Sequence, residues 1–436
     1  MADRPEGRVH KRIISDQQKR RDIALQRQSQ GRRDLQQHAR QLVSLAVPLS
    51  SSSLLESHNA ARVYQNEETS TKEHSEPGQF EEFPADAYYN QLDTEEENDL
   101  GMLQATKLRG SRAREWFKQQ FMQPEWMVDA PSRLRDDWYV MARPAGERCL
   151  VVSSNGTTVS RLRNGRIHHC FPSALPNGAR THAAATSSQV FCILDCIFYE
   201  PDNIYYVIDM LCWRGYSLYD CSYEFRQFWI KSKLEETGVL DAPSKWHRYQ
   251  FQIVPTFECD KAGLQEAYNG IVPFERDGCL FLNRHAHYIL GVTPLSLLWK
   301  DPATSRYHID TDSKGDIPAY QQIVLEYQED GTVATCDDPK VVFGSLPQEF
   351  LRENNQHLQP GILLKFAIGD QGLTVVDGRP VTADIHYQGV ANRYRAGADS
   401  VSKVLFQYSA RHCPLTISSI IAAIETSEDD FEMDHS

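Results

Sequence analysis

Short apolar runs, separated by turn residues, recur along the chain from about residue 101 onward. Six of them have the length and the β-branched or aromatic content of strands. They span 138–142, 149–153, 190–199, 205–212, 249–254 and 278–282. Asn155-Gly156 and Asn164-Gly165 are turn signals, and 222–234 has a helical pattern. This pattern predicts an α+β domain built mainly on antiparallel sheet over residues 101–330.

The C-terminal region, 331–436, has a similar pattern. Strands are expected over 361–368, 373–376 and 401–408, and Asp377-Gly378 is typical of a hairpin turn. The last residues are acidic and are expected to form a disordered tail. The sequence therefore predicts an additional β-rich region, but it assigns this region no role.

The N-terminal region is polar and rich in helix formers. Residues 15–42 are expected to form one basic helix, with Ser15 and Asp16 as the N-terminal cap and Gly31 as its weak point. Leu35, Ala39 and Leu42 share a face, but the helix is too polar to bury a stripe against its own protein. We therefore expect it to be stable only when a partner binds it.

Charge is distributed unevenly along the chain, whose formal net charge is −13. The first 45 residues hold eleven Lys and Arg against five acids, about +6, whereas residues 66–100 hold twelve acids against one lysine, about −11. Such charge blocks stay solvated, so 46–100 is expected to be a disordered acidic linker. The basic block, 1–45, is expected to bind a negatively charged partner.

Several classes of protein are disfavoured by what the chain lacks. No apolar run approaches the roughly 18 residues of a membrane span, and no hydrophobic stretch follows the arginine-rich start as in a secretory signal. The ten cysteines include no Cys-x-x-Cys pair. We expect reduced thiols, no metal site and no membrane association.

One set of motifs carries candidate chemistry. Residues 143–148 (Arg-Pro-Ala-Gly-Glu-Arg) lead into a strand, and 205–211, 277–281 and 297–300 follow in order. Their order and spacing resemble the nucleotidyltransferase fold of messenger-RNA capping enzymes and ATP-dependent ligases. In that family a Lys-x-Asp-Gly-x-Arg motif supplies the lysine that attacks the α-phosphate of a nucleotide.

This chain lacks that nucleophile. Arg143 stands at the lysine position and Ala145 at the aspartate position, and no Lys-x-Asp-Gly occurs in the sequence. Arginine does not deprotonate at usable pH and cannot attack a phosphate. The resemblance therefore implies a nucleotide pocket without catalysis, with no catalytic residue and no cofactor.

Longer motifs resemble the snurportin family. They are 125–129, 193–197, 212–221, 225–234 and 277–295, and with the basic block they extend the resemblance over 1–45 and 115–300. The resemblance implies a nuclear import adaptor that binds the 2,2,7-trimethylguanosine (m3G) cap of spliceosomal small nuclear RNAs. A cationic methylated guanine stacks well on an indole face, and such stacking contributes ~1–3 kcal/mol.

The resemblance also implies a set of site residues. Trp299 is expected to be the stacking platform, Trp126 the wall beside the methylated N2, and Arg148 and Arg163 the cations that hold the triphosphate. Arg143 lies where the family varies and is expected to add to them. The predicted site further includes Glu147, Cys149 and Pro124, and Pro124 replaces a polar contact residue of the family.

The partners follow from the same resemblance. The basic helix is expected to bind importin-β through a set of cations: Arg12, Lys19, Arg20, Arg21, Arg27, Arg32, Arg33 and Arg40. A nuclear exportin is a further candidate partner, although the hydrophobic segment that precedes the helix in the family is absent. The expected protein is a monomer that shuttles between nucleus and cytoplasm.

Two alternatives belong to other classes. The first is a divergent RNA guanylyltransferase or ligase-like enzyme, which the missing lysine disfavours. The second is an RNA-binding protein without cap preference. Residues 1–45 contain no Phe, Trp or Tyr, which an RNA-binding arm would place among its charges.

Overall fold

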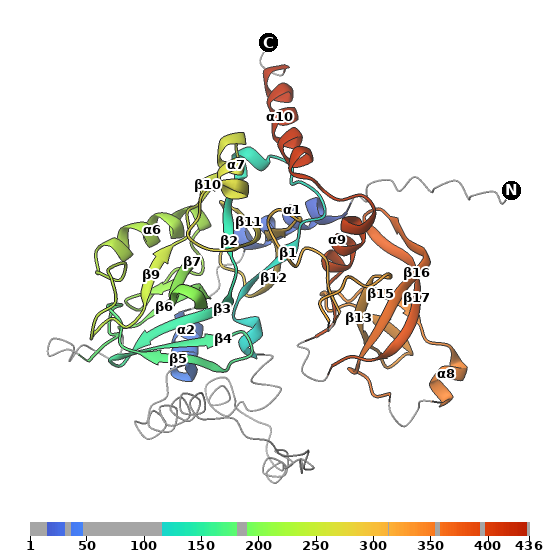
Figure 1. Ribbon diagram of the computed structural model, residues 1–436, viewed down its shortest axis with the longest axis horizontal. Helices are drawn as coiled ribbons and strands as arrows, with labels where there is room; N and C mark the ends of the chain where they lie inside the picture. Colours follow the sequence, from blue (N-terminus) through green and yellow to red (C-terminus); the bar gives the residue numbers. More distant parts are fainter. Residues whose placement is uncertain are drawn as a thin grey trace, which may run out of the picture.

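The computed structural model describes residues 15–30, 36–46, 116–180, 190–312, 314–353, 358–392 and 397–433. Figure 1 shows a large sheet-rich body, a smaller barrel built from the C-terminal third of the chain, and helices at their junction. The predicted linker, 46–100, lies outside the described residues except for Ala46. None of the described helices is long and apolar enough to cross a membrane.

The larger body contains two sheets. The first, sheet A, has the order β1-β12-β11-β2-β10, and its only parallel pair is β1 with β12. Its strands are β1 (Met122–Trp126), β2 (Trp138–Pro144), β10 (Phe257–Glu258), β11 (Arg276–Asn283) and β12 (Gly291–Trp299).

The second sheet, sheet B, has seven strands in the order β5-β4-β3-β6-β7-β8, with β9 paired to β7. Its strands are β3 (Glu147–Ser154), β4 (Thr157–Leu162), β5 (Ile167–Phe171), β6 (Cys192–Tyr199), β7 (Ile204–Trp213), β8 (Tyr216–Ser217) and β9 (Gln250–Ile253). The predicted Asn155-Gly156 turn joins β3 to β4, and both of its residues have positive φ, 52° and 73°.

Each strand of the two sheets alternates its side chains between two cores. One core lies between the sheets and includes Met141 and Leu280 of sheet A and Leu150 and Ile193 of sheet B. A second core covers the outer face of sheet A, and a third covers the outer face of sheet B. The position of a residue within its strand therefore decides which core its side chain joins.

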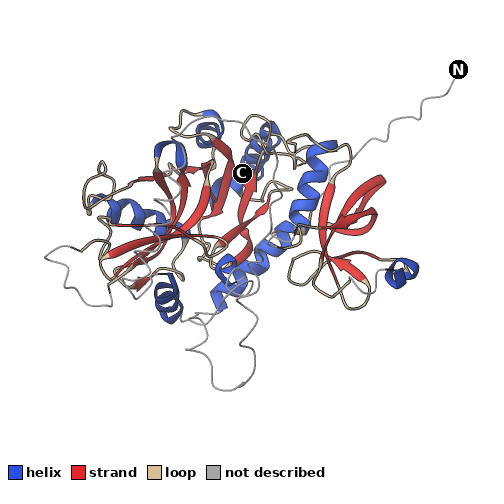
Figure 2. Ribbon diagram, turned by 60° about the horizontal axis from the view of Figure 1, so that its bottom comes forward, coloured by secondary structure: helices blue, strands red, loops and turns tan. Residues whose placement is uncertain are grey.

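Helices cover the outer faces and connect the strands (Figure 2). Helix α6 (Tyr223–Glu235) matches the predicted helix and begins at Ser222, whose hydroxyl accepts from the Phe225 amide. Its Arg226 is fully buried and is held by both carboxylate oxygens of Asp209 on β7, each at 2.8 Å. The other helical segments of this body are α5 (Leu134–Asp137), η2 (Glu200–Asp202) and α7 (Lys261–Asn269).

The basic region forms two helices, α1 (Gln17–Gln30) and α2 (Gln36–Ala46), where one was predicted. Helix α1 ends directly before Gly31. Both helices bury side chains against the larger body, among them Gln17 and Arg21 of α1 and Ala39 and Leu42 of α2. The prediction that this region is too polar to pack against its own protein is therefore wrong.

The C-terminal region forms a five-stranded antiparallel sheet of order β15-β14-β13-β16-β17. Its elements are β13 (Gln322–Tyr327), β14 (Thr332–Ala334), β15 (Val342–Ser345), α8 (Gln348–Glu353), β16 (Leu363–Val376) and β17 (Arg379–Val390). The sheet curls so that β15 approaches β17, as the contact of Gly344 with Ile385 shows. A small, partly open barrel of this kind is typical of the OB-fold. Because it begins at Gln322, the predicted boundary after residue 330 falls inside its first hairpin.

One predicted strand of this region is wrong. Residues 401–408 belong to helix α9 (Val401–His412), which Ser400 caps by accepting from the Lys403 amide. The helix is buried on more than one face, and its closely spaced apolar residues Val404, Leu405 and Phe406 resemble a short buried strand. Helix α10 (Ile417–Met433) follows and returns to the larger body, where it lies against α5 and α7.

Candidate nucleotide-binding site

A small cavity lies between the two sheets. It is lined by Met122, Arg148, Ile208, Asp209, Leu280, Leu282, Tyr288 and Ser296. Its volume of about 10 Å³ leaves room for about one water molecule. A nucleotide therefore enters this region only if side chains move or the sheets separate.

Arg148 on β3 is the central cation of this region. Its guanidinium donates to both oxygens of Asp195 on β6, at 2.9 and 2.6 Å, and to the Met122 carbonyl at 2.8 Å. Tyr288 donates to the same carboxylate at 2.7 Å. Burial opposes the charge of Arg148, but Asp195 outweighs burial and raises its pKa. The predicted phosphate-binding residue is thus held in place by a buried carboxylate.

A second group of charges lies at the adjacent ends of β2, β11 and β12. Arg143 and Lys300 both donate to Asp277, and Ser305 donates to the same carboxylate at 2.7 Å. Burial lowers the pKa of Lys300 and of Arg143, and Asp277 only partly offsets this. Burial would raise the pKa of Asp277, but Arg143 and Lys300 lower it below its usual value. The two cations share one anion.

Arg163 completes what we call the cation cluster, consisting of Arg143, Arg148, Arg163 and Lys300. Its guanidinium donates to the Gln123 amide oxygen at 2.5 Å. Partial burial, together with Arg148 and Arg143 nearby, lowers its pKa to about 10. Three of the four cations thus bond to two carboxylates, Asp195 and Asp277, and Arg163 bonds to the neutral Gln123. An excess of positive charge in a partly buried region favours an anionic ligand such as a polyphosphate.

Trp299 does not line the cavity, so its prediction as the stacking platform is wrong. The indole is fully buried in the core on the outer face of sheet A, and its Nε1 donates to the Leu415 carbonyl at 3.0 Å. Leu298, one residue earlier, points to the opposite face. An added Cβ at Gly278 would lie 3.4 Å from its side chain, near Lys300. The cation cluster is therefore flanked by a leucine at this position.

Trp126 is half-buried and lies at the junction with the C-terminal region. Its ring packs against Phe406 of α9, with ring centroids 4.8 Å apart, and the Lys300 ammonium lies 5.8 Å from its centroid. The two tryptophans belong to adjacent strands, because Trp126 pairs with Leu298. Trp126 is thus near the cation cluster through Lys300, but it does not form a slot with Trp299.

Three further predicted residues lie away from the cluster. Glu147 and Cys149 flank Arg148 on β3, so they point to the other face of sheet B. Cys149 is buried in the core on that face, and the Glu147 carboxylate lies 3.6 Å from His168. The prediction that they contact a cap is wrong in this structure. Pro124 pairs with Thr293 at an irregularity of β1 and has no polar side-chain group to offer.

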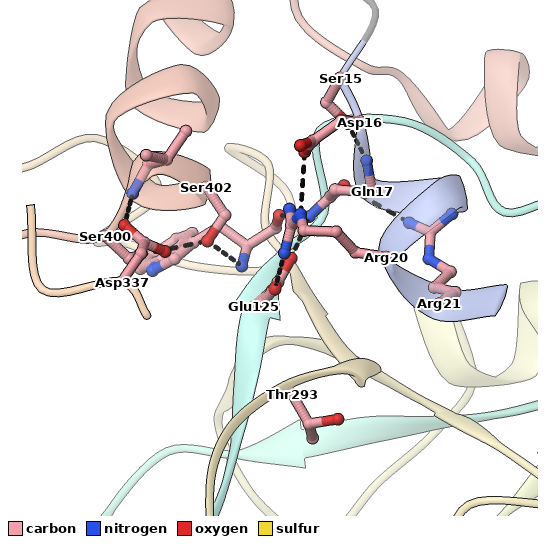
Figure 3. A network of polar contacts seen from close by, with 12 residues as sticks. Ser15, Asp16, Gln17, Arg20, Arg21, Glu125, Thr293, Asp337, Ser400 and Ser402 are labelled. Carbon is pink, nitrogen blue, oxygen red and sulfur yellow. Dashed lines mark hydrogen bonds and ion pairs between the residues drawn. The ribbon is translucent and has the colours of Figure 1, made fainter. Parts of the chain in front are cut away.

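Helix α1 lies across the end of β1, next to Trp126. Figure 3 shows Gln17 and Arg20 reaching Glu125, the buried residue before Trp126. The Gln17 amide donates to Glu125 at 2.9 Å and to the Trp126 carbonyl at 2.8 Å, and its oxygen accepts from the Val128 amide at 3.1 Å. These bonds satisfy both ends of a buried glutamine, so the docked position of α1 is specific.

Polar and charged residues at the start of α1 make further contacts on both sides of β1. Arg21 is 2% exposed and lies 5.7 Å from the centroid of Trp138, and burial lowers its pKa to about 10. Asp16 bonds Arg20 at 2.8 Å and, from the barrel, Arg379 at 2.9 Å. Ser15 donates to Asp129 through its amide at 2.6 Å and its hydroxyl at 2.5 Å. The start of α1 thus connects the larger body with the barrel.

The predicted importin-binding cations are therefore not equivalent. Arg20 and Arg21 are engaged by the protein itself. Lys19, Arg27 and Arg40 are exposed. Arg12, Arg32 and Arg33 lie outside the described residues.

Sequence reasoning missed several residues that hold the site. Asp277 and Lys300 belong to motif segments named above, 277–281 and 297–300, but they were given no role at the site. Gln123, Asp195 and Ser305 were not considered. A lone carboxylate at a strand end has no sequence signature, but its position next to a motif of the nucleotidyltransferase type was a usable signal. Within the described ranges, no group of three or more His, Cys, Asp or Glu residues could hold a metal ion.

The chain is similar to two classes of known protein. Solved structures similar to it include a mycobacterial DNA ligase D complexed with ATP and MES, with 10% identity and a TM-score of 0.30, covering 64% of this chain and 97% of the ligase. The ATP-dependent DNA ligase of bacteriophage T7, in complex with ATP, has 10% identity and a TM-score of 0.29, covering 63% and 99%. The described strands and helices confirm the predicted sheet-rich α+β class.

The second similarity is more specific. Residues 120–302 match the family model described as Snurportin1, m3G cap-binding domain. The resemblance to snurportin is therefore confirmed over this segment, which contains both sheets of the larger body and the whole cation cluster. Residues 120–302 are thus similar to a cap-binding domain of the snurportin type.

Proposed function

We propose that this protein is a nuclear import adaptor that binds the m3G cap of small nuclear RNAs and carries the particle through its N-terminal helices. The main support is that the cation cluster lies inside the segment that matches the cap-binding domain family. A cap presents a triphosphate, and four cations with two carboxylates among their partners suit such an anion. The cap would replace Asp277 as the partner of Arg143 and Lys300.

The base would lie next to the cluster, where Leu298 and the half-buried Trp126 offer apolar surface. Two methyl groups on guanine N2 remove the donors of that edge, so an apolar wall favours them over an unmethylated amine. Titration with the dinucleotides m3GpppG, m7GpppG and GpppG tests this proposal, with intrinsic tryptophan fluorescence as the signal. Equal affinity for all three would leave RNA binding without cap preference as the better description.

The second half of the proposal concerns importin-β. Lys19, Arg27 and Arg40 are exposed on α1 and α2 and are available to an acidic groove. Arg20 and Arg21 become available only when α1 leaves β1. Binding should therefore weaken with salt, because many charge pairs form at once. Pull-down of importin-β by the wild-type chain and by a Lys19→Glu, Arg27→Glu variant tests this, and retention of full binding would contradict it.

We further propose that the protein is not an enzyme. Arg143 occupies the position of the ligase lysine and forms an ion pair with Asp277. Incubation with radiolabelled GTP and Mg²⁺, followed by denaturing electrophoresis, tests this directly. A labelled protein band would favour the guanylyltransferase alternative. The protein is expected to shuttle between nucleus and cytoplasm, which imaging of a fluorescent fusion would check.

A further inference from the structure

A surface beyond the cation cluster combines cations with aromatic rings. We call it the β5 rim and define it by Arg166, Lys245, Trp246, Arg248 and Tyr249. Arg166 lies on the turn between β4 and β5, and the other four lie in the segment that precedes and enters β9. The Arg248 amide donates to the Pro172 carbonyl at 3.1 Å, which holds this segment against the end of β5.

The two parts of the β5 rim meet at His169 on β5. The Tyr249 ring lies 4.9 Å from the His169 ring, and the Arg248 guanidinium lies 5.5 Å from the Tyr249 centroid. Burial, His168, Arg248 and Arg166 together lower the pKa of His169 to about 4, so both arginines lie close to this ring. At neutral pH the histidine is uncharged, and the positive charge comes from the arginines.

The cations of the β5 rim are available to a ligand. Arg166, Lys245 and Arg248 are exposed, and none of them has a carboxylate partner among the residues that the structure describes. Lys245 lies 5.2 Å from the ring of Trp246, which is 52% exposed. The acids nearest to His168 are Glu147 and Glu200, and they form the limit of the surface on that side.

The β5 rim continues the cation cluster. Arg163 and Arg166 lie on the same turn, and Arg163 is close enough to Arg143 and Arg148 for both to lower its pKa. The side of this turn next to β1 faces the proposed triphosphate site, and the other side leads along β5, whose five residues span about 16 Å. The whole chain has a net charge of −13, so its composition does not explain a run of free cations that starts at the proposed cap site.

We propose that the β5 rim binds the first unpaired nucleotides that follow the cap of the bound RNA. Arginine and lysine bind the phosphates, and the exposed Trp246 and the half-buried Tyr249 offer faces on which bases stack, the combination that single-stranded RNA sites use. This inference rests on the proposed cap-binding function for the direction in which the RNA runs along the rim, but the rim itself binds RNA whether or not a cap is present.

The test compares three fluorescent probes by anisotropy: m3GpppG, an m3G-capped ten-nucleotide oligoadenylate, and the same oligoadenylate without a cap. We expect the capped oligonucleotide to bind at least about fivefold more tightly than the dinucleotide. In the Arg166→Ala, Arg248→Ala variant this advantage is lost while dinucleotide affinity stays unchanged. The slope of log Kd against log[salt] falls by about 1.4 in this variant, because it loses two phosphate contacts and each contact to a single strand contributes about 0.7.

A matched control removes two exposed cations elsewhere, Lys231 on α6 and Arg352 on α8, as Lys231→Ala, Arg352→Ala. Unchanged binding of the capped oligonucleotide by this control supports the proposal. Equal losses in both double variants, or no loss in the rim variant, overturn it. Trp246→Ala provides a second readout without a charge change and should weaken only the two oligonucleotides. If m3GpppG does not bind but the rim variant still weakens the uncapped oligonucleotide, the cap function fails and the rim assignment stands.

Discussion

At the scale of single residues, the alternation of side chains along a strand decides which motif residues can act together. Arg148 faces the inter-sheet cavity, whereas its neighbours Glu147 and Cys149 face the other side of sheet B. Likewise Trp299 and Leu298 point to opposite faces of sheet A. The predicted cations Arg143, Arg148 and Arg163 lie near one another in the structure, and their role in binding a cap stays a prediction. Residue types did not locate the aromatic platform, because a shift of one position along a strand moves a side chain to the opposite face of the sheet.

The first prediction follows from the burial of Trp299. Trp299→Ala removes a large fully buried side chain and a hydrogen bond, so we expect it to destabilise the protein by about 3–5 kcal/mol. Leu298→Ala should cost less stability and should weaken cap binding instead. Urea unfolding and cap titration of the two variants separate these effects. A stable Trp299→Ala protein that has lost only cap affinity would restore the stacking role.

The second prediction concerns Asp277 and pH. Burial would raise the pKa of Asp277 in the folded protein, but Arg143 and Lys300 outweigh burial and lower it below the ordinary 3.8. A carboxylate with a lowered folded pKa contributes stability above its unfolded pKa, and this contribution is lost as pH falls through the folded value. Thermal unfolding between pH 6 and pH 3 should therefore show a steeper loss for wild type than for Asp277→Asn. Parallel curves would contradict it.

At the scale of elements, strands β2, β3, β6, β7, β9 and β11 and helix α6 were predicted from apolar runs bounded by turn or cap residues. Other elements were not, and two of them show why. Helix α9 is buried on more than one face, and three adjacent apolar residues at its centre, 404–406, also fit a buried strand. Helix α1 docks through buried Gln17 and Arg21, polar residues that carry no signal of burial. Tertiary hydrogen bonds decide the position of α1, and sequence pattern does not report them.

The third prediction tests the docking of α1. Glu125 accepts from both Gln17 and Arg20, and removing one partner of a buried charge pair is strongly destabilising for that contact. We expect Glu125→Ala to detach α1 and to increase tryptic cleavage after Arg20 and Arg21, measured by limited proteolysis and mass spectrometry. Asp22→Asn, which alters an exposed acid on the same helix, is the control. Equal protection in wild type and Glu125→Ala would show that other contacts hold the helix.

At the scale of the whole molecule, the C-terminal region completes the core on the outer face of sheet A. The Leu415 carbonyl accepts from Trp299, and Phe406 packs against Trp126. Ile420 and Ile424 of α10 are buried in the same core as Trp299. No sequence motif indicated this, because residues 331–436 lie outside the motifs that resemble known families and long-range packing is not a local property. The larger body is therefore not an independent unit in this chain.

The fourth prediction is that a chain ending at residue 398 is unstable. Truncation removes Phe406, Leu415, Ile420 and Ile424 from a shared core, and each buried side chain of this size contributes about 1.5–3 kcal/mol. We expect the melting temperature to fall by more than about 10 °C. Differential scanning calorimetry of the full and truncated chains measures this, with a chain ending at residue 433 as control. An unchanged melting temperature would show that the larger body folds without α9 and α10.

The bond of Asp16 with Arg379 makes the first turn of α1 a tether for the barrel as well as for β1. Any receptor that removes the helix therefore also releases one attachment of the barrel, and the free energy of that release is subtracted from the receptor's apparent affinity. By thermodynamic reciprocity, a cargo that shifts the barrel or β1 changes the readiness of the helix to leave by the same amount. If the N-terminal helices bind a receptor as proposed, this ion pair is one of the contacts that couple receptor binding to the barrel.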